Sequence, residues 1–131
     1  MSSTISRFKI TNEIRSILIN DPDLYNLIGT KIYPLIAPEK TIGDTILYYR
    51  DQSFNEYCNE GVYSKKNNIF IVITSDDYEK SQDIVELVNN LIEGIHINEN
   101  KQNFECRLID STEDYEDKKY LQLLLFQVDL N

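Results

Sequence analysis

The sequence contains few of the residues on which most enzyme active sites depend. It has one histidine, His96, and only four glycines among its 131 residues. Nucleophilic and general-base mechanisms usually place a histidine beside a nucleophile or a carboxylate, whereas His96 lies in a polar connection after Gly94, where a surface position is the simpler interpretation. A phosphate-cradling loop needs several glycines close together, and four in the whole chain leave little room for one. We therefore expect a protein that is not an enzyme and holds no cofactor.

Metal and redox motifs are missing too. The two cysteines, Cys58 and Cys106, have neither metal-binding nor redox spacing, so we expect unpaired thiols. Small groups of carboxylates could in principle supply the oxygen ligands that Mg²⁺ or Ca²⁺ requires. Each group has a simpler explanation as a helix cap or as the solvated tip of a hairpin. These groups are Asp21 with Asp23, Asp76 with Asp77, and Glu113, Asp114, Glu116 and Asp117. The sequence therefore predicts no metal site.

Long apolar runs and an excess of positive charge are also absent. No run approaches the roughly 18 apolar residues of a membrane helix, and the polar N-terminus does not resemble a signal peptide. The net charge of −9 opposes broad attraction to nucleic acid or to an anionic membrane. Lys65 and Lys66 beside Tyr63 are too few to form a nucleic-acid patch. We expect a single domain, residues 1–131, made and kept in a cytoplasm and without membrane contact.

The first third of the chain carries a specific succession of helix and turn signals. Four apolar residues share one face of a first helix, which ends at Asn20: Ile10, Ile14, Ile17 and Leu18. Asp21 and Pro22 suit the cap and first position of a second helix, and Gly29 suits its end. Ile32-Tyr33-Pro34 then leaves in extended form. This succession resembles the opening of the small tail-completion and tail-terminator proteins of tailed bacteriophages and prophages.

The resemblance covers nearly the whole chain and implies an α+β fold. It implies a four-stranded, mainly antiparallel sheet with two long helices packed on one face, in α-β-β-α-β-β order. We expect the long helices at about 4–19 and from Asp76, capped with the help of Glu79, to Gly94, and a short helix at 22–28. The strands are expected at about 45–52, 63–74, 104–113 and 118–129. The stretches 54–66 and 94–103 are expected to be polar connections.

Three of the expected strands are apolar at successive positions. Residues 69–73 and 121–126 carry apolar side chains on both faces apart from Gln122, and residues 46–49 nearly do so, whereas a strand covered on one face only should alternate. Two long helices on one face leave part of the other uncovered, so we expect a neighbouring subunit to cover it. We therefore assign Ile71 and Leu123 to a subunit or partner interface. The alternative within one chain is that the stretch 54–66 folds back over the sheet.

Tyrosine is unusually frequent, with nine copies and no tryptophan. Tyrosine is enriched at protein interfaces because it combines a large apolar ring with a polar tip, although aromatic residues are also ordinary in sheets. We expect Tyr57, Tyr63 and Tyr78 to lie at an interface. Phe54 joins them because it lies in the same polar stretch as the first two.

The resemblance implies a virion structural protein that forms a ring, completes the phage tail and joins it to the head connector. Such rings are commonly hexamers, and a dodecamer around the connector of a short-tailed phage is the variant. The implied partners are other copies of the chain, the tail tube and connector or portal-associated proteins, with DNA only as passing cargo. The implied location is the tail or the head-tail junction, after assembly in the host cytoplasm. The main alternative is a monomeric acidic protein-binding module, a nucleic-acid mimic or inhibitor.

Overall fold

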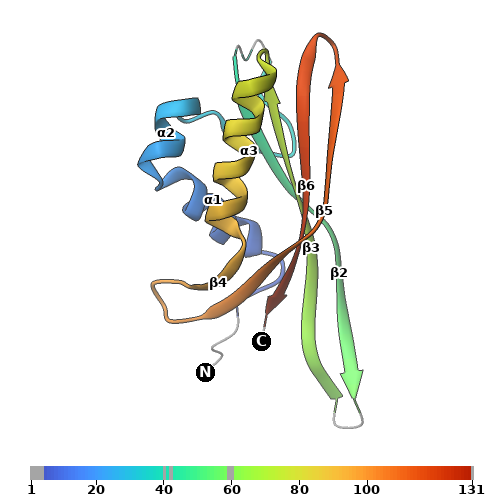
Figure 1. The fold of residues 1–131 in the computed structure, drawn as a ribbon. Helices are drawn as coiled ribbons and strands as arrows, with labels where there is room; N and C mark the ends of the chain where they lie inside the picture. The colour runs from blue at the N-terminus through green and yellow to red at the C-terminus, as the bar shows by residue number, and fades with distance from the viewer. Residues whose placement is uncertain (1–4, 40, 42, 59–60, 131) are drawn as a thin grey trace.

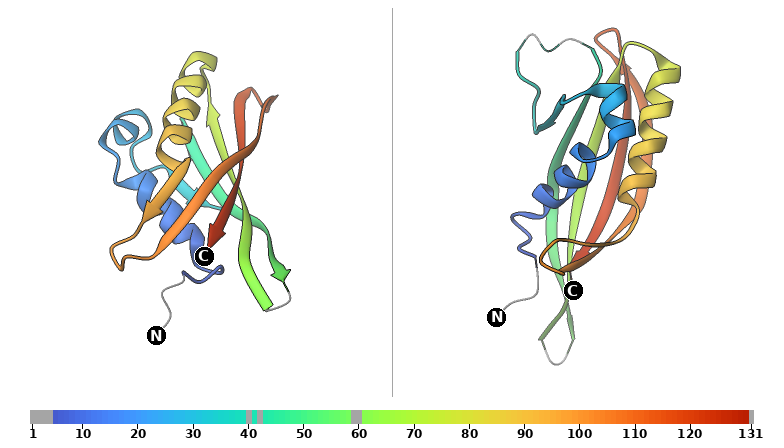
Figure 2. Two further views of the ribbon diagram at one scale, coloured as in Figure 1. Left: turned by 60° about the horizontal axis from the view of Figure 1, so that its bottom comes forward. Right: turned by 90° about the vertical axis from the view of Figure 1, so that its left-hand side faces the viewer.

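The structure is a computed structural model that describes residues 5–39, 41, 43–58 and 61–130. Within these ranges the side chains of residues 52, 54–58 and 61–64 are not described. Six strands form one sheet in the order β1-β2-β3-β6-β5-β4. The strands are β1 (Ile32–Pro34), β2 (Thr45–Cys58), β3 (Gly61–Ser75), β4 (Gly94–Ile97), β5 (Asn103–Glu116) and β6 (Lys119–Leu130). The helices α1 (Ile10–Ile19), α2 (Pro22–Ile28) and α3 (Tyr78–Ile92) lie on one face of the sheet (Figures 1 and 2).

The expected fold class is therefore wrong. The sheet is mixed and has six strands rather than four, because short strands are added at both edges. At one edge, β1 pairs in parallel with β2, with Ile32 opposite Ile46. At the other, β4 pairs with β5, with Gly94 opposite Cys106. Each added strand has three or four residues, too few to show the alternation by which a strand is recognised in a sequence.

The helices also differ in part from expectation. Only α3 is long, because α1 begins at Ile10 and residues 5–9 are not helical; position 4 lies outside the described residues. The short helix α2 is confirmed, since Asp21 Oδ2 accepts a hydrogen bond from the Leu24 amide at 2.9 Å and Gly29 adopts a φ of +65°. The sequence predicted α2 because Asp21, Pro22 and Gly29 all indicate a helix with these bounds.

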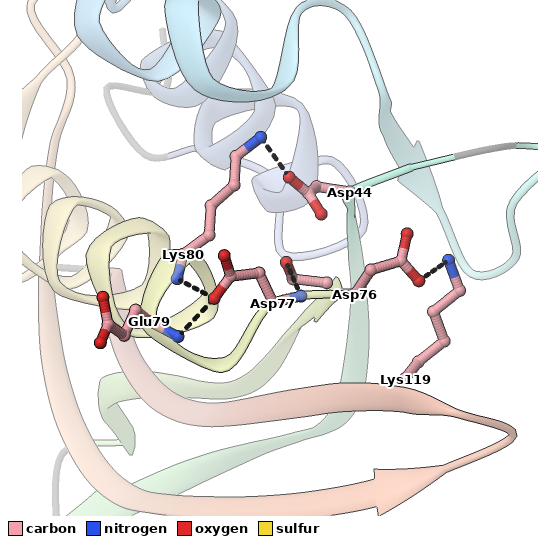
Figure 3. A network of polar contacts seen from close by, with 7 residues as sticks. Asp44, Asp76, Asp77, Glu79, Lys80 and Lys119 are labelled. Atoms are coloured by element: carbon pink, nitrogen blue, oxygen red, sulfur yellow. Dashed lines mark hydrogen bonds and ion pairs between the residues drawn. The ribbon is translucent and has the colours of Figure 1, made fainter.

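Helix α3 begins one residue later than expected. Asp77, and not Asp76, caps it, with Oδ1 accepting from the amides of Glu79 and Lys80 at 2.9 and 3.4 Å (Figure 3). Asp76 instead forms an ion pair with Lys119, 2.8 Å away on β6. The helix ends at Ile92, and Gly94, with a φ of +122°, begins β4.

The core lies between the helices and the facing side of the sheet. Helix residues such as Ile14 and Ile84 are fully buried against alternate residues of β3 and β6, including Ile71 and Phe126. Burial alternates along β3 from Asn67 to Ser75 and along β6 from Leu121 to Leu130, so that every second side chain there points to the helices and the intervening ones point away. The helices thus cover one face of the central strands and leave the other uncovered.

The stretch 54–66 is not a loop, which corrects a second expectation. Strands β2 and β3 remain paired as far as Cys58 opposite Gly61, and they form a long hairpin that extends past the helices (Figure 1). The β5–β6 hairpin turns at the opposite end of the sheet through Asp117 and Lys118, both with positive φ, as in a type I′ turn. The expected strands leave residues 114–117 between them, but Asp114, Tyr115 and Glu116 are still paired with β6.

Three single-residue bulges interrupt the strand pairing, and one of them lies near the end of the β2–β3 hairpin, between the pairs Glu56 with Ser64 and Tyr57 with Val62. Asp51 is the extra residue in β2, between the pairs Arg50 with Ile69 and Gln52 with Asn68. Ile109 is the extra residue in β5, directly after Leu108. Arg50 and Leu108 lie in one cross-sheet row, through Ile69 and Phe126, so the sheet bends at the same level on both sides. In the described part of the chain, no helix is long and apolar enough to cross a membrane.

Candidate interaction face

The sheet face turned away from the helices, here called the outer face, carries a continuous apolar patch. Its rows are defined by strand register: Leu47, Val72 and Leu123 lie side by side, and Tyr49, Phe70 and Leu125 form the next row. All six side chains are partly exposed. The rings of Tyr49 and Phe70 pack together at a tilt of 31°, with centroids 5.4 Å apart. Side chains arranged in this way present one apolar surface instead of scattered contacts.

Polar groups surround this patch. Asn68 and Gln127 form the next row, and beyond them Lys66 Nζ lies 3.6 Å from the carboxylate of Asp129. On the β5 side, Thr112 lies opposite Leu123 and Asp110 opposite Leu125. An apolar centre with a polar rim is the usual anatomy of a protein interface.

The structure separates the two strand residues that the sequence assigned to an interface. Leu123 lies in the centre of the outer face. Ile71 points to the helices and is completely buried in the core of the chain. Neighbouring residues in a strand point to opposite faces of the sheet. Without the strand register, the sequence does not show which apolar residues face the helices and which face outward.

The four predicted aromatic residues fall in two places. Tyr78 begins α3 and is 40% exposed; its hydroxyl donates to the Glu113 carboxylate at 2.8 Å, and its ring lies 5.5 Å from that of Tyr120. This hydrogen bond raises the pKa of Tyr78, and hydrogen bonds from Gln122 and Tyr78 together lower the pKa of Glu113. Phe54, Tyr57 and Tyr63 belong to the projecting β2–β3 hairpin, but their side chains lie outside the described residues.

A second apolar surface was not predicted. Leu35 and Ile36 follow β1 and are 66% and 78% exposed, beside an exposed Phe8. Leu35 has a φ of +65°, which is unfavourable for a leucine, and its amide donates to the Tyr48 carbonyl at 3.0 Å. The signal in the sequence was the pair Leu35-Ile36 directly after Pro34, at a turn where apolar side chains are unusual.

The residues with catalytic or metal-binding chemistry make structural contacts. His96 Nε2 lies 2.6 Å from the Ile92 carbonyl, and its ring stacks on Phe104. Burial raises the pKa of Cys106 to about 12, which keeps it a protonated thiol. Among the described residues, no three His, Cys, Asp or Glu side chains gather as metal ligands. That the chain is not an enzyme stays a prediction.

Comparison with known proteins finds similarity in structure and not in sequence. No protein family model and no curated protein matches the sequence. The fold is similar to a chain in the structure titled "Virion of native gene transfer agent (GTA) particle", with a TM-score of 0.77 and 13% sequence identity. The match covers 89% of this chain and 90% of that one. The two chains therefore share a fold over almost their whole lengths.

Proposed function

We propose that this protein is a phage-type virion structural protein. The observation that carries the proposal is the apolar outer face, because a folded subunit that leaves such a surface uncovered needs another protein to cover it. The structural relative supports the same role, since its structure is titled as a virion particle and it shares nearly the whole fold. A structural role also suits a chain whose histidine and buried cysteine make internal contacts.

In this proposal, copies of the chain form a ring that completes the tail and joins it to the head connector. Copies in a ring, together with the tube or connector proteins above and below, would cover the outer face. A hexamer is the expected state, and a dodecamer is the alternative. The net charge of −9 suits a ring through which DNA passes, because acidic groups repel phosphate and do not retain it.

Solution mass and particle imaging test this role. We expect native mass spectrometry of the purified chain, alone and mixed with tail tubes, to give a ring mass, and electron microscopy to show a closed ring at the tube end. A chain that remains monomeric in both samples, or that is absent from purified particles, would contradict the proposed role.

Leu123→Asp tests whether the outer face is the assembly surface. We expect the variant to fold, because Leu123 is only partly buried, but to lose assembly, because the contact would have to bury an unpaired charge. Tyr25→Asp is the matched control, since Tyr25 is an exposed aromatic residue on α2, on the other face. Melting temperature and ring mass are measured for both variants. Normal assembly of Leu123→Asp would remove the outer face from the proposal.

A further inference from the structure

One edge of the sheet, next to β1, carries a group of exposed apolar side chains. Phe8, Leu35 and Ile36, here called the shelf, are 75%, 66% and 78% exposed. Phe8 and Leu35 line a shallow hollow of about 250 Å³ together with Arg50, whose guanidinium lies 4.8 Å from the centre of the Phe8 ring. Large apolar side chains gathered at one exposed place indicate a surface that another protein covers.

Leu35 is unfavourable in the free chain in two respects. Its φ of +65° is a conformation that leucine adopts only with strain, whereas asparagine and glycine adopt it readily. Its side chain is also mostly exposed, so burial within its own chain does not compensate for the strain. Backbone strain of this kind is typical of functional positions. Contact with another protein would bury the leucine side chain and explain its presence here.

The opposite edge of the sheet, formed by β4, carries further exposed apolar side chains. Ile95 and Ile97 are 73% and 68% exposed. They alternate with His96, whose ring stacks on the buried Phe104, so the two isoleucines point away from the core. Exposed apolar side chains thus lie at both ends of the strand order, on β4 and just after β1.

The turn that follows β4 is held by its own hydrogen bonds. Asn98 Oδ1 accepts from the amides of Asn100 and Gln102, both at 2.9 Å, and the Asn98 side-chain amide donates to Gln102 Oε1 at 2.9 Å. A segment that is already ordered loses little conformational entropy when it binds. Residues 95–102, here called the β4 turn, therefore present their apolar side chains from a preorganised backbone.

The hollows beside these two surfaces carry charges of opposite sign. Within the described chain, the hollow at the shelf is lined by Arg50 and by no carboxylate. The hollow beside the β4 turn, about 390 Å³ in volume, is lined by Glu13 and Glu99 and by no lysine or arginine. Asp51 and Lys101, which follow the lining residues in the chain, are exposed and carry the opposite signs, so the difference rests on the lining residues. A shelf therefore suits a β4 turn better than it suits a second shelf.

We propose that the shelf of one copy of this protein binds the β4 turn of the next copy. Ile95 and Ile97 of one copy pack on the apolar shelf of its neighbour, and Arg50 of that neighbour faces Glu99. The inference rests on the proposed function and names a contact between copies in its ring. Because the two surfaces differ and lie at opposite edges of the sheet, each copy can use both at once. Head-to-tail contacts of this kind generate rings.

Two variants, each with one surface blocked, test this contact under the conditions in which the wild-type chain forms rings. Ile36→Asp places a charge on the shelf, and Ile97→Asp places one on the β4 turn. Neither variant should form rings by itself, because the contact would have to bury an unpaired charge. An equal mixture should form one-to-one dimers but no rings, because the intact β4 turn of the first variant meets the intact shelf of the second. Native mass spectrometry after brief cross-linking, with one variant isotope-labelled, identifies these dimers.

Tyr25→Asp is the matched control for both variants. It adds the same charge at an exposed aromatic residue that lines neither hollow, and it should form rings as the wild-type chain does. Melting temperatures should be similar for all three variants, because each replaced side chain is exposed. Normal rings from either blocked variant, or a mixture without one-to-one dimers, would overturn the contact and leave the proposed role intact.

Leu35→Asn separates the contact from folding. Asparagine tolerates a positive φ, so the melting temperature should stay the same or rise. The concentration needed for ring formation should nevertheless rise by about tenfold, because the shelf loses an apolar side chain. A variant that folds as expected and forms rings at the wild-type concentration would overturn the shelf as the contact. A wild-type chain that forms no ring, either alone or on tail tubes, would overturn the role itself and this contact with it.

Discussion

Asp44 connects the start of β2 to helix α3 through an ion pair with Lys80. It lies just before β2, is almost fully buried, and places Oδ2 2.6 Å from Lys80 Nζ on α3 (Figure 3). Burial by itself would raise the pKa of Asp44, but hydrogen bonds from Lys80 and Ser75, the positive charge of Lys80 and the Asp76 backbone together lower it below its ordinary value of 3.8. The ionised carboxylate is therefore more stable in the folded chain than in the unfolded one.

This lowered pKa predicts a loss of stability in acid. A carboxyl group with a lowered folded-state pKa stabilises the fold above its ordinary value, and that contribution is lost as the pH falls through the folded-state value. We expect Asp44→Asn to lower the free energy of unfolding by about 1.5–3 kcal/mol at pH 7 and by progressively less as the pH falls below about 4. Urea unfolding from pH 7 to pH 2 measures the difference. Asp76→Asn, at a more exposed ion pair, is the control and should change little; equal losses at both sites at pH 7 would contradict the assignment.

At the scale of the element, the two adjacent aspartates that precede α3, Asp76 and Asp77, have different roles. Asp77→Ala removes a side-chain cap and should lower the free energy of unfolding by about 1 kcal/mol, because two helix amides lose their acceptor. Asp76→Ala removes only a surface ion pair with Lys119 and should cost about 0.5 kcal/mol or less. Denaturant unfolding of both variants at pH 7 compares them. The reverse order would show that Asp76 is the cap after all.

Elements with local signals could be predicted, and those whose stability comes from pairing could not. Helix α2 was predicted because Asp21, Pro22 and Gly29 each fix a backbone feature by themselves. Residues 54–66 were interpreted as a loop because a hairpin that projects beyond the helices has no core face and so lacks apolar alternation. Strand β4 was missed because its identity comes from pairing with β5, and nothing within its four residues reveals that partner.

The same reasoning explains how much of the candidate site the sequence could reveal. Apolar residues at successive strand positions correctly predicted a sheet with two apolar faces, and Leu123 lies on the uncovered one. Ile71 was grouped with it because composition alone carries no register. The points at which β1 stops pairing with β2, and β4 with β5, could not be predicted either, because they depend on strand register.

At the scale of the whole molecule, the projecting hairpin is separable from the domain. β3 pairs with β6 only from Lys65 onward, so within the described chain Gly61–Ser64 have only β2 as a strand neighbour. Residues 56–64 can therefore be replaced by an Asn-Gly turn between Asn55 and Lys65, which face each other. The core residues between the helices and the sheet are untouched by this change.

We expect the shortened chain to remain folded and to lose ring formation, because the part of the β2–β3 hairpin that projects past the helices has been removed while the core is retained. Melting temperature and ring mass measure the two effects separately. A full-length chain with Tyr57→Thr and Tyr63→Thr is the matched control, since it keeps the backbone edge and removes two aromatic side chains. Rings in this control, but not in the shortened chain, would assign the contact to strand pairing. Loss of rings in both would assign it to the aromatic anchors expected from the sequence, and rings in both would show that the hairpin does not join the copies. An unfolded shortened chain would show instead that the hairpin is part of the folding unit.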